Sequence, residues 1–100
     1  MYLRVVCFKF QETTTEQDIQ SHCQGLVAFK ERVPQIVTYA GGRSIETVVD
    51  GKPQWGSLHY FTFAHMEDIE TYVHHPAHLE FIERYKHLWK DVMVCNATID

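Results

Sequence analysis

The chain has 100 residues, of which 45% are hydrophobic and 22% are charged, and its formal net charge is −4 at pH 7. This composition excludes an intrinsically disordered chain, and the length predicts a single domain over residues 1–100. An acidic chain without a cluster of lysine and arginine lacks the electrostatic footprint of a nucleic-acid-binding protein, so we expect no nucleic-acid partner.

The first predicted strand covers residues 2–10, where side chains alternate between two largely apolar faces. One face carries Tyr2, Arg4, Val6, Phe8 and Phe10. The apolar stretch is short and is interrupted by Arg4 and Lys9, which fits neither a signal peptide nor a membrane span. We therefore expect a cytoplasmic protein that does not contact a membrane.

The first predicted helix begins at Thr14 or Thr15, because either can cap its N-terminus with Gln17 or Asp18 three positions further on. The apolar residues that follow at helical spacing are Ile19, Cys23, Leu26, Val27 and Val33. Pro34 restricts the residue before it to extended conformations, so we expect this helix to run to about Val33.

Two strands are predicted in the middle of the chain. Residues 35–49 are rich in β-branched and aromatic residues, and the pair Gly41-Gly42 indicates a bend or a bulge. Asp50-Gly51 is a two-residue hairpin signal, so we expect the chain to turn there. Residues 54–63 continue as a strand, and one of its faces carries Ser57, His59, Phe61 and Phe63.

Two helices and a last strand complete the prediction. Residues 65–75 predict a short helix that ends before Pro76. Residues 77–92 predict a second helix. Its apolar stripe consists of Phe81, Tyr85, Leu88, Trp89 and Val92. Residues 92–99 predict the closing strand.

The resulting order is β-α-β-β-α-β, which predicts a ferredoxin-like α+β sandwich with its strands in the order 4-1-3-2. Helices cover one face of such a sheet and leave the other without a partner. Because twofold pairing is the commonest assembly of soluble proteins, we expect a homodimer that packs through its sheet faces. The cysteines Cys7, Cys23 and Cys95 are an odd set without CxxC spacing, which predicts buried, reduced thiols and neither disulfides nor a zinc cage.

The segments VVCFKF, FKERVP, FTF, YVHHPAHLEF and DVMV resemble, in order and spacing, the stress-responsive A/B barrel (Dabb) family from end to end. The HPAH element is the most specific of them. The resemblance implies a homodimeric α+β barrel with a small-molecule pocket between the sheet and the helices of each monomer. Members include plant polyketide cyclases that perform an aldol condensation without metal or organic cofactor, so it also implies that no cofactor is needed. Many members have no assigned activity.

The same resemblance implies site residues. In the cyclases the second histidine of the HPxH element is the base and a tyrosine six residues before it assists, and these map onto His78 and Tyr72. The cyclases carry further histidines where this chain has Arg4 and Ser57. This departure argues against an identical reaction. His59 lies on the same face as Ser57 and could place an imidazole in the same pocket at another depth.

These residue types fit acid–base chemistry. The positive end of a helix dipole favours a neutral His78, which can remove a proton, and Tyr72 could hold an enolate oxygen or orient the imidazole. If it points inward, Arg4 supplies a positive charge suited to a carboxylate or an enolate. Phe81 and Trp89 are expected in the core and could also line an apolar pocket. We therefore hypothesise a cofactor-independent lyase, cyclase or isomerase.

Other interpretations stay open. His75 and His78 could fasten the junction of two half-helices by bonding to its free backbone groups, in a non-catalytic dimeric stress-response or ligand-binding protein. A cofactor-free monooxygenase is a third possibility. His74 and His78 are four residues apart, but Pro76 prevents them from sharing a helical face, so we expect no metal site there. The histidines expected at the surface or as caps are His22, His65, His74, His75 and His87.

Overall fold

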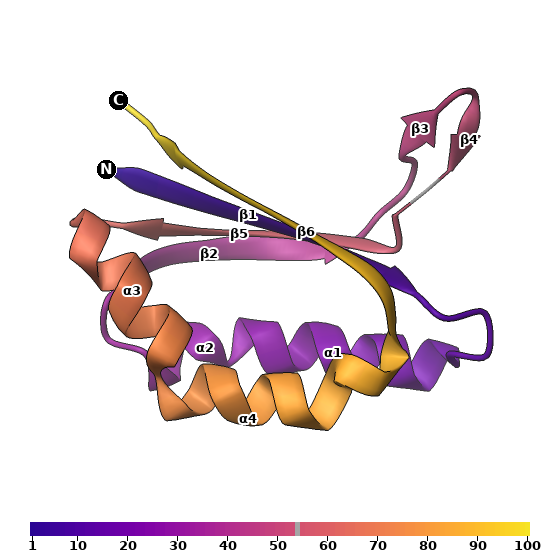
Figure 1. The fold of residues 1–100 in the computed structure, drawn as a ribbon, viewed down its shortest axis with the longest axis horizontal. Coiled ribbons are helices and arrows are strands. Elements are labelled where there is room, and N and C mark those ends of the chain that lie inside the picture. Colours follow the sequence, from indigo (N-terminus) through magenta and orange to yellow (C-terminus); the bar gives the residue numbers. More distant parts are fainter. Residues whose placement is uncertain (54) are drawn as a thin grey trace.

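The computed structural model describes residues 1–53 and 55–100. Its elements are β1 (Tyr2–Phe10), α1 (Glu16–Val27), α2 (Phe29–Arg32), β2 (Ile36–Arg43), β3 (Val48–Val49), β4 (Lys52–Pro53), β5 (Ser57–Phe63), α3 (Met66–His74), α4 (Pro76–Tyr85), the 3₁₀ turn η1 (Lys86–Leu88) and β6 (Trp89–Thr98). The main sheet has the strand order β2-β5-β1-β6, and the helices cover one of its faces (Figure 1). The ferredoxin-like α+β fold and its strand order are confirmed.

The register of the sheet places its polar and apolar side chains. β1 pairs antiparallel with both β5 and β6, so Arg4 lies opposite Phe61 on one side and Asn96 on the other. The side chains on this face of the sheet meet α1, α2, α3 and α4. The largest fully buried apolar residues there are Leu26, Phe29, Val33, Phe61, Phe63 and Tyr72. The face that was predicted to carry Arg4 therefore does point toward the helices.

The first helix is shorter than expected. The Thr15 side chain accepts a hydrogen bond from the Asp18 backbone N–H at 3.1 Å, while the Asp18 carboxylate accepts from the Thr15 N–H, so the predicted capping box is confirmed. However, the helix ends at Val27, and a short second helix, α2, follows Ala28. The expectation of one continuous helix to Val33 was wrong in this respect.

The Asp50-Gly51 turn is confirmed, but it belongs to a separate ribbon. Asp50 has φ of 52° and Gly51 has φ of 78°, the two positive values that a type I′ hairpin turn requires. β2 ends at Arg43, and β3 and β4 form their own two-stranded sheet, which projects from the main sheet (Figure 1). The expected strand over residues 35–49 is thus interrupted. Gln54, the expected start of the next strand, lies outside the described residues.

The long C-terminal helix is also shorter than the apolar stripe suggested. α4 ends at Tyr85, and Trp89 and Val92 belong to β6. They lie opposite Phe10 and Phe8 in the ladder with β1. A helical stripe and an inward-facing strand can both bury these two side chains, and the antiparallel ladder with β1 decides in favour of the strand.

The face of the sheet away from the helices is apolar and uncovered. Leu58, Tyr60 and Met93 point to this side and expose 45%, 38% and 39% of their surface. Cys7 is buried on the same face, whereas Cys23 is half-buried and Cys95 is exposed, so only part of the expectation of buried thiols holds. Within the described residues, no helix is both long and apolar enough to cross a membrane.

The break between α3 and α4 generates a prediction. The His75 ring nitrogen Nδ1 accepts a hydrogen bond of 3.0 Å from the Ala77 backbone N–H and so caps α4. His75→Ala should lower the free energy of unfolding by about 0.5–2 kcal/mol, the usual cost of a lost N-cap, measured by urea denaturation. The neighbouring exposed His74 is the control, and His74→Ala should change stability by less than about 0.5 kcal/mol. Equal effects of the two substitutions would contradict the capping role.

Candidate functional site

A cavity of about 160 Å³ lies between the sheet and the helices. The sequence-predicted residues that line it are Arg4, Tyr72, His78, Phe81 and Trp89. They come from β1, α3, α4 and β6, so the fold gathers side chains that are far apart in the chain. Most of the remaining lining is aliphatic. An apolar cavity with a few convergent polar groups is typical of a small-molecule site.

The hydrogen bond of His78 determines which ring nitrogen is basic. Nδ1 lies 2.9 Å from the Val73 carbonyl oxygen. A carbonyl oxygen can only accept, so Nδ1 carries the proton and donates it. In the neutral ring Nε2 then has a free lone pair, and this is the nitrogen that can take a proton from a ligand.

Burial keeps this ring neutral. Desolvation is the main cause that lowers the pKa of His78, and the positive charge of Arg4 also lowers it, while the hydrogen bond to Val73 opposes them. The pKa therefore lies below the ordinary histidine value of about 6.5. At neutral pH the imidazole is available as a base.

Tyr72 supports His78 by packing. Its side chain is 1% exposed, and its ring centroid lies 4.6 Å from that of His78 at an interplanar angle of 47°. Burial raises the pKa of the Tyr72 phenol above its ordinary value, although the nearby Arg4 opposes this shift. Tyr72 is therefore protonated at all ordinary pH values and can act only as a hydrogen-bond donor or a neutral acceptor.

Arg4 brings a positive charge to the same cavity. Its guanidinium carbon lies 5.6 Å from the Tyr72 ring centroid, within the range of a cation–π contact. Nη1 donates to the Asn96 side-chain oxygen at 3.2 Å. Nε is buried, and no hydrogen-bond acceptor reaches it among the described residues. This side chain therefore has a donor left for a ligand.

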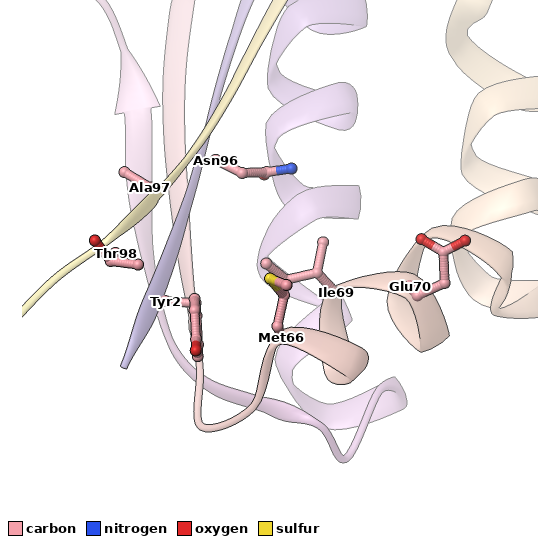
Figure 2. A pocket seen from close by; sticks show the side chains of 7 residues that line it. All are labelled: Tyr2, Met66, Ile69, Glu70, Asn96, Ala97 and Thr98. Atoms are coloured by element: carbon pink, nitrogen blue, oxygen red, sulfur yellow. The ribbon is translucent and has the colours of Figure 1, made fainter.

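A second hollow of about 290 Å³ is lined by residues of β1, α3 and β6. Figure 2 shows Tyr2, Met66 and Ile69 around it, with the Asn96 side chain pointing toward the helices. Arg4 lines the cavity and Asn96 lines this second hollow, and the hydrogen bond between them joins the two.

Ser57 and His59 do not reach the lining of this cavity. Both are 0% exposed and lie on the part of β5 next to Phe8. The His59 ring bonds through Nδ1 to the Tyr39 hydroxyl at 2.7 Å and through Nε2 to the Ser57 hydroxyl at 3.0 Å. Burial lowers the pKa of His59 to about 4. The structure therefore places these two residues in a buried polar network.

His22 was expected at the surface or as a cap, and this prediction was wrong. The side chain is 0% exposed, and the Trp89 indole N–H donates to its Nε2 at 2.8 Å. Burial, with a smaller effect of His59, lowers the pKa of His22 to about 3. The sequence did contain a signal, because His22 follows Ile19 by three residues and precedes Leu26 by four, the spacing of one helix face.

Comparison with known proteins gives a consistent picture of the fold. A family model described as Stress responsive A/B Barrel Domain (Dabb) matches residues 3–99. Among curated proteins, none matches the sequence.

Three solved structures illustrate the similarity. Hydroxynitrile lyase from Passiflora edulis aligns with a TM-score of 0.85 and 15% identity over 99% of this chain and 93% of that one. A dimeric ferredoxin-like protein of unknown function from Thermobifida fusca aligns with a TM-score of 0.82 and 14% identity, over 98% of this chain and 90% of that one. SnoaB, a cofactor-independent oxygenase from Streptomyces nogalater, aligns with a TM-score of 0.74 and 15% identity, over 98% of this chain and 91% of that one. At these identities the likeness shows a shared fold.

The position of His59 depends on a close approach of two strands, which generates a prediction. A Cβ at position 41 would lie 2.6 Å from the Leu58 carbonyl oxygen and 2.7 Å from His59 Nδ1. Gly41→Ala should therefore destabilise the protein by about 1–3 kcal/mol, the usual cost of overpacking. A Cβ at Gly42 would meet no atom within 4 Å, so Gly42→Ala is the matched control and should stay within about 0.5 kcal/mol. Chemical denaturation checks both, and a neutral Gly41→Ala would contradict the packing of His59 against β2.

Proposed function

Because the chain belongs to the stress-responsive A/B barrel (Dabb) family, we propose that it is a cofactor-independent enzyme of the lyase, cyclase or isomerase kind. Its substrate is a small ketone or polyketide-like carbonyl compound. His78 is the general acid–base group, Tyr72 is its partner, and Arg4 binds the oxygen on which charge develops. The named activity of the Passiflora lyase supports this class without identifying the reaction.

The single observation that carries the proposal is the hydrogen bond from His78 Nδ1 to the Val73 carbonyl. This bond fixes the tautomer in which Nε2 of His78 is a base. The side chain that carries this base lines the cavity. A histidine that served only to hold the helix junction would need Nδ1 alone. The remaining nitrogen is the one that an acid–base mechanism uses.

The chemical step that these groups support is proton transfer next to a carbonyl. Nε2 of His78 takes a proton from the carbon beside the carbonyl, and the electron pair of the C–H bond forms the enolate. The negative charge that appears on oxygen is stabilised by the Arg4 guanidinium and by a hydrogen bond from Tyr72. The enolate carbon then takes back a proton from the imidazolium of His78, or it attacks a second carbonyl carbon. In the second case the C=O electron pair moves to oxygen, which takes the imidazolium proton, so both routes restore the neutral ring.

The size of the cavity limits the substrate. About 160 Å³ is below the ~300–1,000 Å³ that drug-sized ligands usually occupy, so the substrate is small. Phe81 and Trp89 present aromatic surface toward an apolar part of the substrate. We propose Ser57 and His59 as a more distant polar wall that a ligand would reach only if the aromatic side chains between them moved.

A non-catalytic role in ligand binding or stress response is the second candidate function. The small volume of the cavity favours it. The cofactor-independent oxygenase among the similar structures makes cofactor-free oxygenation a third. The three differ in outcome, because only the first releases a rearranged, cleaved or condensed product without consuming oxygen.

The proposed function is tested with ligands and one paired set of variants. Small ketones, β-keto acids and phenolic carboxylates are screened by thermal shift, and stabilising compounds are then assayed for turnover. His78→Asn keeps an amide N–H that can bond to the Val73 carbonyl but lacks Nε2. It should therefore keep ligand binding and a thermal midpoint within a few degrees of the wild type while turnover is lost.

The pH profile separates acid–base catalysis from simple binding. Since the pKa of His78 lies below about 6.5, turnover should be constant above that pH and should fall as pH decreases through the pKa, because protonated His78 cannot accept a proton. Ligand stabilisation without turnover in the wild type would favour the binding protein. Undiminished turnover in His78→Asn would contradict the assigned base.

We further propose that the chain forms a homodimer through the uncovered face of the sheet and acts in the cytoplasm. The dimeric state of the Thermobifida fusca protein supports the first part, as do the exposed apolar side chains on that face. The three free cysteines suit a reducing compartment and support the second.

The proposed interface can be tested by charge insertion. Tyr60 lies at the centre of the uncovered face, on β5 between β1 and β2. Tyr60→Glu should convert the dimer to a monomer in sedimentation equilibrium at micromolar concentration, because it would bury an unpaired charge. Leu79, which is 49% exposed on α4, is the control, and Leu79→Glu should leave the dimer unchanged. A wild-type protein that sediments as a monomer at this concentration would refute the interface.

A further inference from the structure

We propose that His22, Cys23 and His59 form a binding site for a single Zn²⁺ ion, separate from the cavity that contains His78. His22 and Cys23 are neighbours on α1, and His59 faces them from β5. One ring nitrogen of each histidine and the Cys23 Sγ all lie within 4.8 Å of one another. This inference does not depend on the proposed enzymatic function.

The three side chains suit zinc in chemical type. Imidazole nitrogen and cysteine sulfur are the ligands that Zn²⁺ prefers, and three protein ligands with one open position are a usual zinc set. Burial keeps both histidines neutral, so each ring has one nitrogen with a lone pair. The thiol of Cys23 releases its proton to solvent when sulfur binds the ion, so binding is accompanied by proton release.

An unpaired buried atom points to a ligand at this place. Nδ1 of His22 is buried, and no residue in the described part of the chain hydrogen-bonds to it. Its other nitrogen already accepts from the Trp89 indole N–H. Buried polar atoms nearly always have a partner, so an orphan nitrogen in a fully buried ring requires an explanation. Because Nε2 accepts, Nδ1 carries the proton in this tautomer, so it can bind a cation between His22, Cys23 and His59 only when that proton moves to Nε2.

The hydrogen bonds around His59 provide the outer support that metal-bound histidines normally have. If Nε2 binds the ion, Nδ1 keeps its proton and donates it to the Tyr39 hydroxyl, which lies 2.7 Å away. The Ser57 hydroxyl is then released from Nε2 and lies next to the ion, where it or a water molecule can fill the fourth position. Gly41 allows this arrangement because any larger residue would collide with His59.

The ion has a route from solvent. A groove of about 420 Å³ runs between α1 and β2 and is lined by Cys23 together with Glu16, Gln20, Gly42 and Arg43. Cys23 is the half-buried member of the trio, whereas both histidines are fully buried. The sulfur is therefore the ligand that an incoming ion meets first.

Zinc binding has a consequence at the other site. When Nδ1 of His22 binds the ion, the proton of the neutral ring moves to Nε2, and Nε2 can no longer accept from the Trp89 N–H. A hydrogen bond between neutral groups is weak beside a bond from nitrogen to a metal ion, so the indole N–H loses this partner and the side chain reorients. Because Trp89 also lines the cavity, zinc should alter its indole fluorescence and the shape of the cavity.

The experiment uses the full chain after treatment with a chelator. Zn²⁺ alone is added in equilibrium dialysis, and one equivalent should bind per chain and raise the thermal midpoint. Co²⁺ as a spectroscopic substitute should show a thiolate-to-cobalt charge-transfer band. Trp55→Phe removes the other tryptophan, so the emission change on adding Zn²⁺ reports on Trp89 alone.

Two cysteine variants distinguish binding at this site from nonspecific metal binding. Cys23→Ser should abolish the charge-transfer band and the stoichiometric binding, with folding checked by circular dichroism. Cys95→Ser is the matched control, because Cys95 is exposed on β6 outside the trio, and it should bind as the wild type does. The proposal is overturned if the wild type binds no zinc, if Cys23→Ser still shows the thiolate band, or if Cys95→Ser loses binding equally.

Discussion

The arrangement of the candidate site depends on Pro76, which cannot donate a backbone hydrogen bond and holds His75 extended at φ of −65° and ψ of 140°. In an unbroken helix the Ala77 N–H would bond to the Val73 carbonyl. Here the Ala77 N–H donates to His75 Nδ1, and the Val73 carbonyl accepts from His78 Nδ1. Two imidazoles thus replace one backbone hydrogen bond, and the change in direction between α3 and α4 turns His78 toward the sheet.

This exchange joins the structural and the chemical interpretations of the motif YVHHPAHLEF. The structural role uses Nδ1 of both histidines, and in His75 the capping bond accounts for the side chain. In His78 the same kind of bond leaves Nε2 at an apolar cavity beside Arg4 and Tyr72. A junction that only needed to be closed would be served by any short hydrogen-bond donor. An imidazole adds a base at no further structural cost, so the two roles reinforce each other.

The fold could be predicted from the sequence because strand alternation, the Thr15 cap, the Asp50-Gly51 turn and Pro76 are local signals that agree with the final packing. The end of α4 could not, since Trp89 is buried equally well by a helix or by a strand, and only pairing with β1 decides between them. Tyr72, His78 and Phe81 were expected at the cavity because they come from one motif, and Arg4 because of the alternation in β1, whereas Trp89 was expected on a helix and lies on β6. The network around His22 was missed because a polar residue on an apolar helix face signals burial only when its partners are known.

The face of the sheet that meets the helices carries two polar groups: the cavity residues around His78, and the network around His22. The two groups share aromatic neighbours. Phe8 contacts His22 at 4.4 Å and Trp89 at 5.1 Å between ring centroids, and Phe8 and Trp89 both line the cavity. The Trp89 indole can donate only one hydrogen bond, and His22 Nε2 receives it. The orientation of this wall of the cavity is thus set by the protonation and ligation of a histidine on α1. The indole is thus the hydrogen-bonded link between His22 and the cavity, while Phe8 and Phe81 contact the His22 ring by packing alone.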